Sequence, residues 1–241
     1  MRGFVLLAVL AVPVGLAGGC AHRPPTIAHV HLGHAITAAH DTPDQVGYMT
    51  LAEEQAQAAL ASAEAALAET SLDGLKRRVA EVDQVTNRLR PYPLVGAVQE
   101  AASHIEYAAL SEDASENVRA GQRQFAQGIE GVLTRGTLIE SYARDVAAAT
   151  SEEEARALAE EVHSLARANL HGEDVDGDGT IGSDPAEYGV RQIRGDLDAL
   201  IGREDPAYVT VDRWYLFNLI RLPSGEWIFA RSRSRGTDAY Q

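Results

Sequence analysis

Cysteine is nearly absent from this sequence, since Cys20 is the single one among 241 residues. One cysteine excludes an intramolecular disulfide, and the Cys-x-x-Cys-His attachment of haem is also missing. The sequence lacks the His-Glu-x-x-His pattern of zinc proteases and the Gly-x-Ser-x-Gly elbow of hydrolases. Any functional site therefore has to be sought in clusters of other residues.

Positive charge and aromatic residues are also scarce. Lys and Arg number 21 against 35 Asp and Glu, the net charge is −14, and aromatic residues make up 6%. A protein that binds nucleic acid needs a basic face, so this class of partner is excluded. Alanine is abundant together with Glu, Arg, Leu and Gln, a composition typical of helices. We therefore expect a mainly helical, acidic protein whose charge favours cations.

The N-terminus carries an apolar run that is too short to span a bilayer as a helix. Arg2 precedes the run Phe4–Val12, and Leu16–Ala17–Gly18–Gly19–Cys20 follows it. This pattern resembles a bacterial lipoprotein signal with its lipobox, although the lipobox leucine lies one place further from the cysteine than usual. The resemblance implies cleavage before Cys20, a diacylglycerol on its sulfur, and acylation of the new amino terminus. The alternative is an ordinary secretory signal in which Cys20 is incidental.

Removal of the signal removes Arg2 and no acid, which leaves 20 basic and 35 acidic side chains, a net charge of −15. Ala21 follows the cysteine, and by resemblance to lipoprotein sorting this favours the outer membrane, facing the periplasm, in a host with two membranes. We expect contact with the membrane through the lipid on Cys20, and an envelope protein as a further partner.

Hydrophobic periodicity predicts a bundle of about six helices after this N-terminal part. Their expected ranges are 50–69, 72–89, 94–110, about 115–149, 151–170 and 185–202, with N-caps at Ser71 and Ser151. Four glycines inside the fourth helix indicate either close helix crossings or a kink. The expected organisation is a signal at 1–19, a lipid-anchored His-rich segment at 20–49, the bundle at 50–203, a β-hairpin at 204–230 around a Pro-Ser-Gly turn, and a disordered tail at 231–241.

An acidic loop, Asp174–Val175–Asp176–Gly177–Asp178–Gly179–Thr180–Ile181, joins the last two predicted helices. Alternating carboxylates suit Ca²⁺, which takes six to eight oxygen ligands. The loop and its flanking helices resemble the EF-hand family over roughly 152–202. The resemblance implies calcium ligands from the side chains of Asp174, Asp176 and Asp178 and from the carbonyl of Thr180.

The resemblance to an EF-hand fails at the last ligand, because Pro185 stands where the glutamate is usual. Asp184 or Glu187 would have to replace it, and we favour Glu187 because it would lie on the first turn of the last helix. A calcium sensor would need a second, paired loop, so we expect a structural role for calcium. The alternative is a solvated acidic turn, since Asp and Gly favour turns.

Histidines cluster close to the proposed lipid anchor. Four of the eight, His29, His31, His34 and His40, fall within twelve residues. An extended backbone would place His29 and His31 on one face, whereas a helical turn would do so for His31 and His34. Imidazole is the commonest transition-metal ligand, and His104 on the third predicted helix is the best additional candidate. These five histidines would bind zinc, copper or haem, unless they cap helices or lie on a solvated arm.

The sequence therefore predicts an envelope lipoprotein without catalytic activity. It would bind calcium structurally and a transition metal or haem through the clustered histidines. One alternative is an adaptor or scaffold lipoprotein that calcium stabilises. A weaker alternative is a metallo-enzyme that uses the same histidines.

Overall fold

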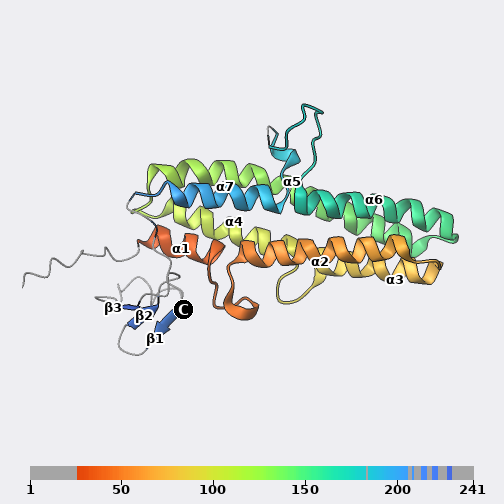
Figure 1. The fold of residues 1–241 in the computed structure, drawn as a ribbon, viewed down its shortest axis with the longest axis horizontal. Coiled ribbons are helices and arrows are strands. Elements are labelled where there is room, and N and C mark those ends of the chain that lie inside the picture. The colour runs from red at the N-terminus through yellow and green to blue at the C-terminus, as the bar shows by residue number, and fades with distance from the viewer. Residues whose placement is uncertain are drawn as a thin grey trace, which may run out of the picture.

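The computed structural model describes residues 26–182, 184–205 and 208, and three short strands beyond them. Seven α-helices form an elongated bundle in this part of the chain (Figure 1). They are α1 (Ile27–Ile36), α2 (Tyr48–Ala68), α3 (Leu72–Asp83), α4 (Leu94–Leu110), α5 (Glu116–Ala148), α6 (Glu152–His171) and α7 (Val190–Gly202). The mainly helical bundle is confirmed, and α1 is the helix beyond the predicted six.

Local signals explain where several helices begin. The hydroxyl oxygens of Ser71, Ser115 and Ser151 accept hydrogen bonds from the backbone N–H three residues later, as N-caps do. The N-caps predicted at Ser71 and Ser151 are thus confirmed. Proline at 91 and 93 separates α3 from α4, because proline lacks the N–H that a continuing helix requires.

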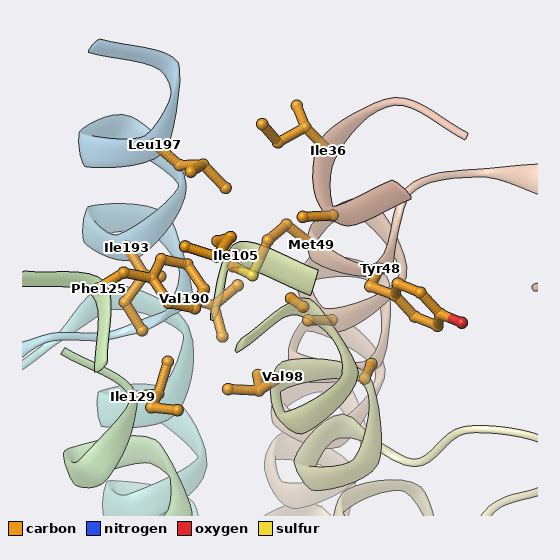
Figure 2. Close-up of a cluster of buried hydrophobic side chains, with 14 of the residues drawn as sticks. Ile36, Tyr48, Met49, Val98, Ile105, Phe125, Ile129, Val190, Ile193 and Leu197 are labelled. Atoms are coloured by element: carbon orange, nitrogen blue, oxygen red, sulfur yellow. The ribbon is translucent and has the colours of Figure 1, made fainter. Parts of the chain in front are cut away.

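The hydrophobic core consists of two clusters placed end to end, and α2 and α5 contribute to both. The first half of α2 and of α5 packs with α1, α4 and α7, whereas their second halves pack with α3 and α6. In the first cluster Met49, Ile105, Phe125 and Ile193 point toward one another from four helices (Figure 2). Many of the buried positions are alanine, so the helices approach closely and neighbouring backbones are near each other.

Helix α5 is one unbroken element of 33 residues despite its internal glycines. A Cβ atom at Gly121 would lie 1.9 Å from Cδ1 of Leu200, and one at Gly136 would lie 2.6 Å from Cγ2 of Val95. These glycines therefore mark close crossings with α7 and α4. They support the close crossings, one of the two alternatives that the sequence left open.

Two helix boundaries differ from the prediction. The second predicted helix ends as α3 at Asp83 and continues as a π-helical turn, η2 (Gln84–Arg88). The last predicted helix does not begin at Pro185, because a separate 3₁₀ turn, η3 (Pro185–Glu187), precedes α7. Asp184 Oδ1 accepts a hydrogen bond of 2.9 Å from the Ala186 N–H and so starts this turn. Another 3₁₀ turn, η1 (Pro43–Gln45), lies between α1 and α2.

The C-terminal part contains three short antiparallel strands, β1 (Arg213–Tyr215), β2 (Leu219–Arg221) and β3 (Trp227–Phe229). Trp214 pairs with Ile220, and Ile220 pairs with Ile228. Residues 222–226 lie outside the described residues, so the hairpin predicted over 204–230 stays a prediction. The signal, Cys20 and the tail at 231–241 also lie outside them. None of the described helices is long and apolar enough to cross a membrane.

Candidate metal centre

The His-rich segment is helical in the structure, as α1. The Thr26 hydroxyl accepts a hydrogen bond from the His29 N–H, and the Asp113 carboxylate accepts bonds from the N–H groups of Ile27 and Ala28 at 2.7 and 3.1 Å. A carboxylate at a helix N-terminus satisfies the first N–H groups and complements the helix dipole. The helical turn therefore places His31 and His34 on one face, and the extended alternative is wrong.

Three of the predicted histidines converge. One ring nitrogen from each of His31, His34 and His104 lies within 4.8 Å of the others. Nδ1 of His31 lies 3.2 Å from Nδ1 of His104, and the rings of His34 and His104 meet edge to face at 4.8 Å. Zinc–nitrogen bonds of about 2.0–2.1 Å in a tetrahedron require nitrogens roughly 3.3–3.4 Å apart. The spacing of His31 and His104 fits this requirement, so α1 and α4 together offer three donors to one ion.

The other two predicted histidines lie apart from this group. The buried His29 has its Nε2 3.0 Å from Oε2 of Glu204, and Oε1 of Glu204 accepts bonds from Ser115 and Asn117. Although burial raises the pKa of Glu204, the hydrogen bonds from Asn117, His29 and Ser115 outweigh it and hold the pKa below its usual value. His29 thus ties α1 to the residues after α7 instead of facing the other ligands.

His40 lies at the edge of the histidine group. It is exposed, and its ring centroid is 6.4 Å from that of His34. We therefore restrict the candidate centre to His31, His34 and His104.

The three converging histidines are held in the neutral form that binds metals. Burial lowers the pKa of all three imidazoles, because a charged ring is poorly solvated there. The neighbouring histidines lower the pKa of His34 and His104 further, and that of His104 falls to about 4. Protons therefore compete weakly with a metal ion at neutral pH.

Aromatic and acidic residues that the sequence reasoning did not select surround this centre. The Tyr48 ring stacks on His104 with centroids 5.4 Å apart and planes 21° from parallel. The Tyr107 ring lies 5.5 Å from that of His31. The Asp41 carboxylate accepts the hydroxyl of Tyr48. No sequence signal places Tyr48 or Tyr107 here, because the contacts depend on how α1, α2 and α4 pack.

The acidic loop projects from the side of the bundle between α6 and α7 (Figure 1). Carboxylate oxygens of Asp174, Asp176 and Glu187 lie within 4.8 Å of one another. Asp174 also accepts hydrogen bonds from the N–H groups of residues 177, 178 and 179 at 2.7–3.1 Å. The loop is therefore wrapped around the Asp174 carboxylate, with Glu187 reaching back from η3.

Glu187 is fully buried. Its carboxylate accepts hydrogen bonds from the N–H groups of Val175, Gly182 and Asp184 at 3.1, 2.9 and 3.4 Å. The bond from Gly182, together with those from the other loop N–H groups, lowers the pKa of Glu187 although burial opposes this. A cation at Glu187 would therefore compete with these loop N–H groups for the carboxylate oxygens. Glu187 was predicted on the first turn of the last helix, but the separate turn η3 supplies it.

Other predicted calcium ligands have different local partners. Oδ1 of Asp178 accepts 2.7 Å hydrogen bonds from both the N–H and the hydroxyl of Thr180. Asp184 accepts the Ala186 N–H. The tight cluster of three acids therefore includes neither Asp178 nor Asp184.

Arg135 fixes the acidic loop to the bundle, and the sequence reasoning missed it. This buried side chain of α5 donates to the carbonyls of Ala186 and Tyr188 and to Oδ1 of Asn169 on α6. Burial lowers its pKa to about 10, so it remains a cation at neutral pH. A faint signal existed, because Gly131 lies one helical turn before it and leaves space for the guanidinium.

The described residues thus contain two clusters that could hold a cation, one of imidazoles and one of carboxylates. The imidazole cluster joins α1 to α4, and the carboxylate cluster joins the end of α6 to η3. No protein-family model, no curated protein and no solved structure matches this chain.

Proposed function

We propose that this protein is a lipid-anchored protein of the cell envelope that binds one zinc or copper ion through His31, His34 and His104. The observation that supports it most is the convergence of three imidazole nitrogens from two helices within 4.8 Å. Burial of three rings beside one another loses hydration, and binding one shared ion would compensate for that loss.

The donor set favours a transition metal. Imidazole suits zinc and copper, whereas calcium and magnesium prefer oxygen ligands. Three donors around one point also fit an ion better than haem, because a porphyrin leaves only two axial positions for the protein. Three protein ligands leave a fourth position open on zinc. An open position suits transfer of the metal to and from other molecules, so we propose metal handling as the role.

The acidic loop would bind calcium with a structural role. Asp174, Asp176 and Glu187 supply carboxylate oxygens, and the loop joins α6 to α7. The attachment of η3 to Arg135 favours a second candidate function. In this alternative, calcium stiffens the bundle as a scaffold for an envelope protein, and the histidines bind no metal.

The lipid anchor would place the histidine centre near a membrane. Cys20 lies six residues before Thr26, the N-cap of α1, so this connection spans roughly 20 Å at most. We propose the outer membrane, with the bundle facing the periplasm, for a host with two membranes. The resemblance of residues 16–20 to a lipobox, with Ala21 after the cysteine, supports this location.

Metal analysis of the full chain, purified in detergent without a histidine tag, tests the proposal. We expect one bound zinc or copper ion per chain after loading and dialysis. His104→Ala should lose that ion, and His163→Ala, which changes a histidine on α6, should retain it. Calcium alone in the wild-type protein would favour the scaffold, and an unchanged metal content in His104→Ala would refute the proposed site.

A further inference from the structure

Tyr48 lies flat against one of the proposed metal ligands. It is the first residue of α2, it is 2% exposed, and its ring stacks on His104 with centroids 5.4 Å apart. Because the two planes lie 21° from parallel, a change in the tilt of the His104 ring would break this stacked contact. The stack therefore restricts the directions in which the nitrogens of His104 point.

Tight packing of the chain before α2 brings Tyr48 to this position. Gly47 is the N-cap of α2, and a Cβ atom there would lie 2.2 Å from the backbone carbonyl carbon of Ile36. Only glycine allows the start of α2 to lie so close to the end of α1. The approach puts Tyr48 beside the helix that carries His31 and His34.

The phenol ring is itself held at its far end. Its hydroxyl lies 2.8 Å from each oxygen of Asp41 and donates to that carboxylate, and the Tyr92 hydroxyl donates to the same group at 2.5 Å. The Tyr92 ring also meets the Tyr48 ring edge to face at 5.3 Å. Burial of Asp41 opposes ionisation, but the hydrogen bonds from Tyr92 and Tyr48 hold its pKa below the usual value. A charged carboxylate thus anchors Tyr48.

We propose that Asp41 and Tyr48 are positioning residues of the histidine metal centre. The carboxylate fixes the phenol, and the phenol fixes the ring of His104. This inference rests on the proposed metal-binding function.

Metal-binding histidines usually gain their orientation from a carboxylate or carbonyl that accepts the other ring N–H. In the described part of the chain His104 has no such partner, since its one hydrogen bond joins its Nδ1 to Nδ1 of His31. That bond is lost when both nitrogens bind an ion. The stack on Tyr48 then remains to orient the ring.

Asp41 also acts through its charge. Its negative charge opposes the lowering of the pKa of His34 and His104, and it would attract a metal cation held by these rings in the same way. The two effects of Asp41 are separable by a double-mutant cycle. If Asp41 acts partly through Tyr48, the loss caused by Tyr48→Phe should vanish when Asp41 is already alanine. If the two residues act independently, their losses should add.

Cobalt(II) is a suitable probe, because its visible absorption reports the geometry of its ligands. The full chain would be titrated with Co²⁺ against a competing chelator, and the spectrum recorded at saturation. We expect Tyr48→Phe to weaken binding about tenfold and Tyr48→Leu by about 10–100-fold, the range for residues that support metal ligands. Tyr48→Leu should also change the visible bands of the saturated protein.

Tyr142→Phe is the matched control, since Tyr142 on α5 packs against the second core cluster, away from the histidine centre. Its effect on Co²⁺ affinity should stay below about threefold. Melting in EDTA identifies any variant that is unfolded without metal, and Tyr48→Phe retains the buried ring. The bands at saturation are a readout that a uniform loss of stability does not move.

The outcomes separate the two levels of the proposal. A wild-type chain that binds no Co²⁺ contradicts the metal-binding function itself. Wild-type affinity and spectrum in both Tyr48 variants would leave the metal centre in place and refute the positioning role. Additive losses in the double variant would refute the connection through Tyr48.

Discussion

Replacement of Arg135 by methionine should loosen the acidic loop and lower the stability of the bundle. Methionine keeps most of the apolar stem but removes donors to the carbonyls of Ala186 and Tyr188 and to the Asn169 side chain. A hydrogen bond to a charged donor contributes about 1.5–3 kcal/mol. Desolvation of the guanidinium, which is visible in its lowered pKa, offsets part of that contribution. We therefore expect a net loss of about 3 kcal/mol for Arg135→Met.

Urea denaturation of the full chain, in calcium and in EDTA, measures this loss. In thermal melts of Arg135→Met, the melting temperature should fall by about 6–12 °C, given about 2–4 °C per kcal/mol for a chain of this size. Arg144→Met on the same helix is the control, because Arg144 is exposed and should change stability by less than about 0.5 kcal/mol. Calcium affinity should also fall in Arg135→Met, since η3 carries Glu187. A stability equal to that of Arg144→Met, or unchanged calcium affinity, would refute this account of Arg135.

Three further changes test other parts of the structure. Asp174→Ala should lower the melting temperature much more in calcium than in EDTA, and an equal loss in both would contradict the calcium site. Glu204 has a lowered pKa in the folded state, so its contribution is present above its unfolded pKa of about 4.5 and is lost as the pH falls through the folded value. Denaturation of Glu204→Gln between pH 5 and pH 3 should therefore show a smaller loss of stability than the wild type, and identical profiles would exclude this linkage. Gly121→Ala should destabilise by about 1–3 kcal/mol through its clash with Leu200, whereas Gly195→Ala, which meets nothing within 4 Å, should stabilise by up to about 1 kcal/mol; thermal melts with the same sign for both would contradict the close crossing.

The helices with clear apolar periodicity could be predicted closely from the sequence. The third predicted helix at 94–110 coincides with α4, and the caps at Ser71 and Ser151 lie where expected. The sequence does not decide between an extended and a helical backbone for the segment that forms α1, because its histidines and apolar residues show no single polar face. The start of α7 was misplaced because proline commonly opens a helix, whereas here the side chains of Asp184 and Glu187 stabilise a separate turn.

The candidate metal centre was only partly predictable. The three-residue spacing of His31 and His34 indicated a shared face, and His104 was selected on the correct helix. His29 turns to Glu204 instead, a contact across 175 residues that no local pattern reveals. Tyr48, Asp41 and Arg135 were missed for the same reason, because their roles depend on packing between distant helices.

X-ray absorption of the zinc-loaded full chain is the most direct test of the proposed centre. The account predicts three imidazole nitrogens at about 2.0–2.1 Å from the metal, with one further light ligand. His104→Ala should reduce the imidazole contribution, and His29→Ala should leave it unchanged. A spectrum with oxygen ligands alone, or an equal imidazole signal in His104→Ala, would contradict the assignment of this centre to His31, His34 and His104.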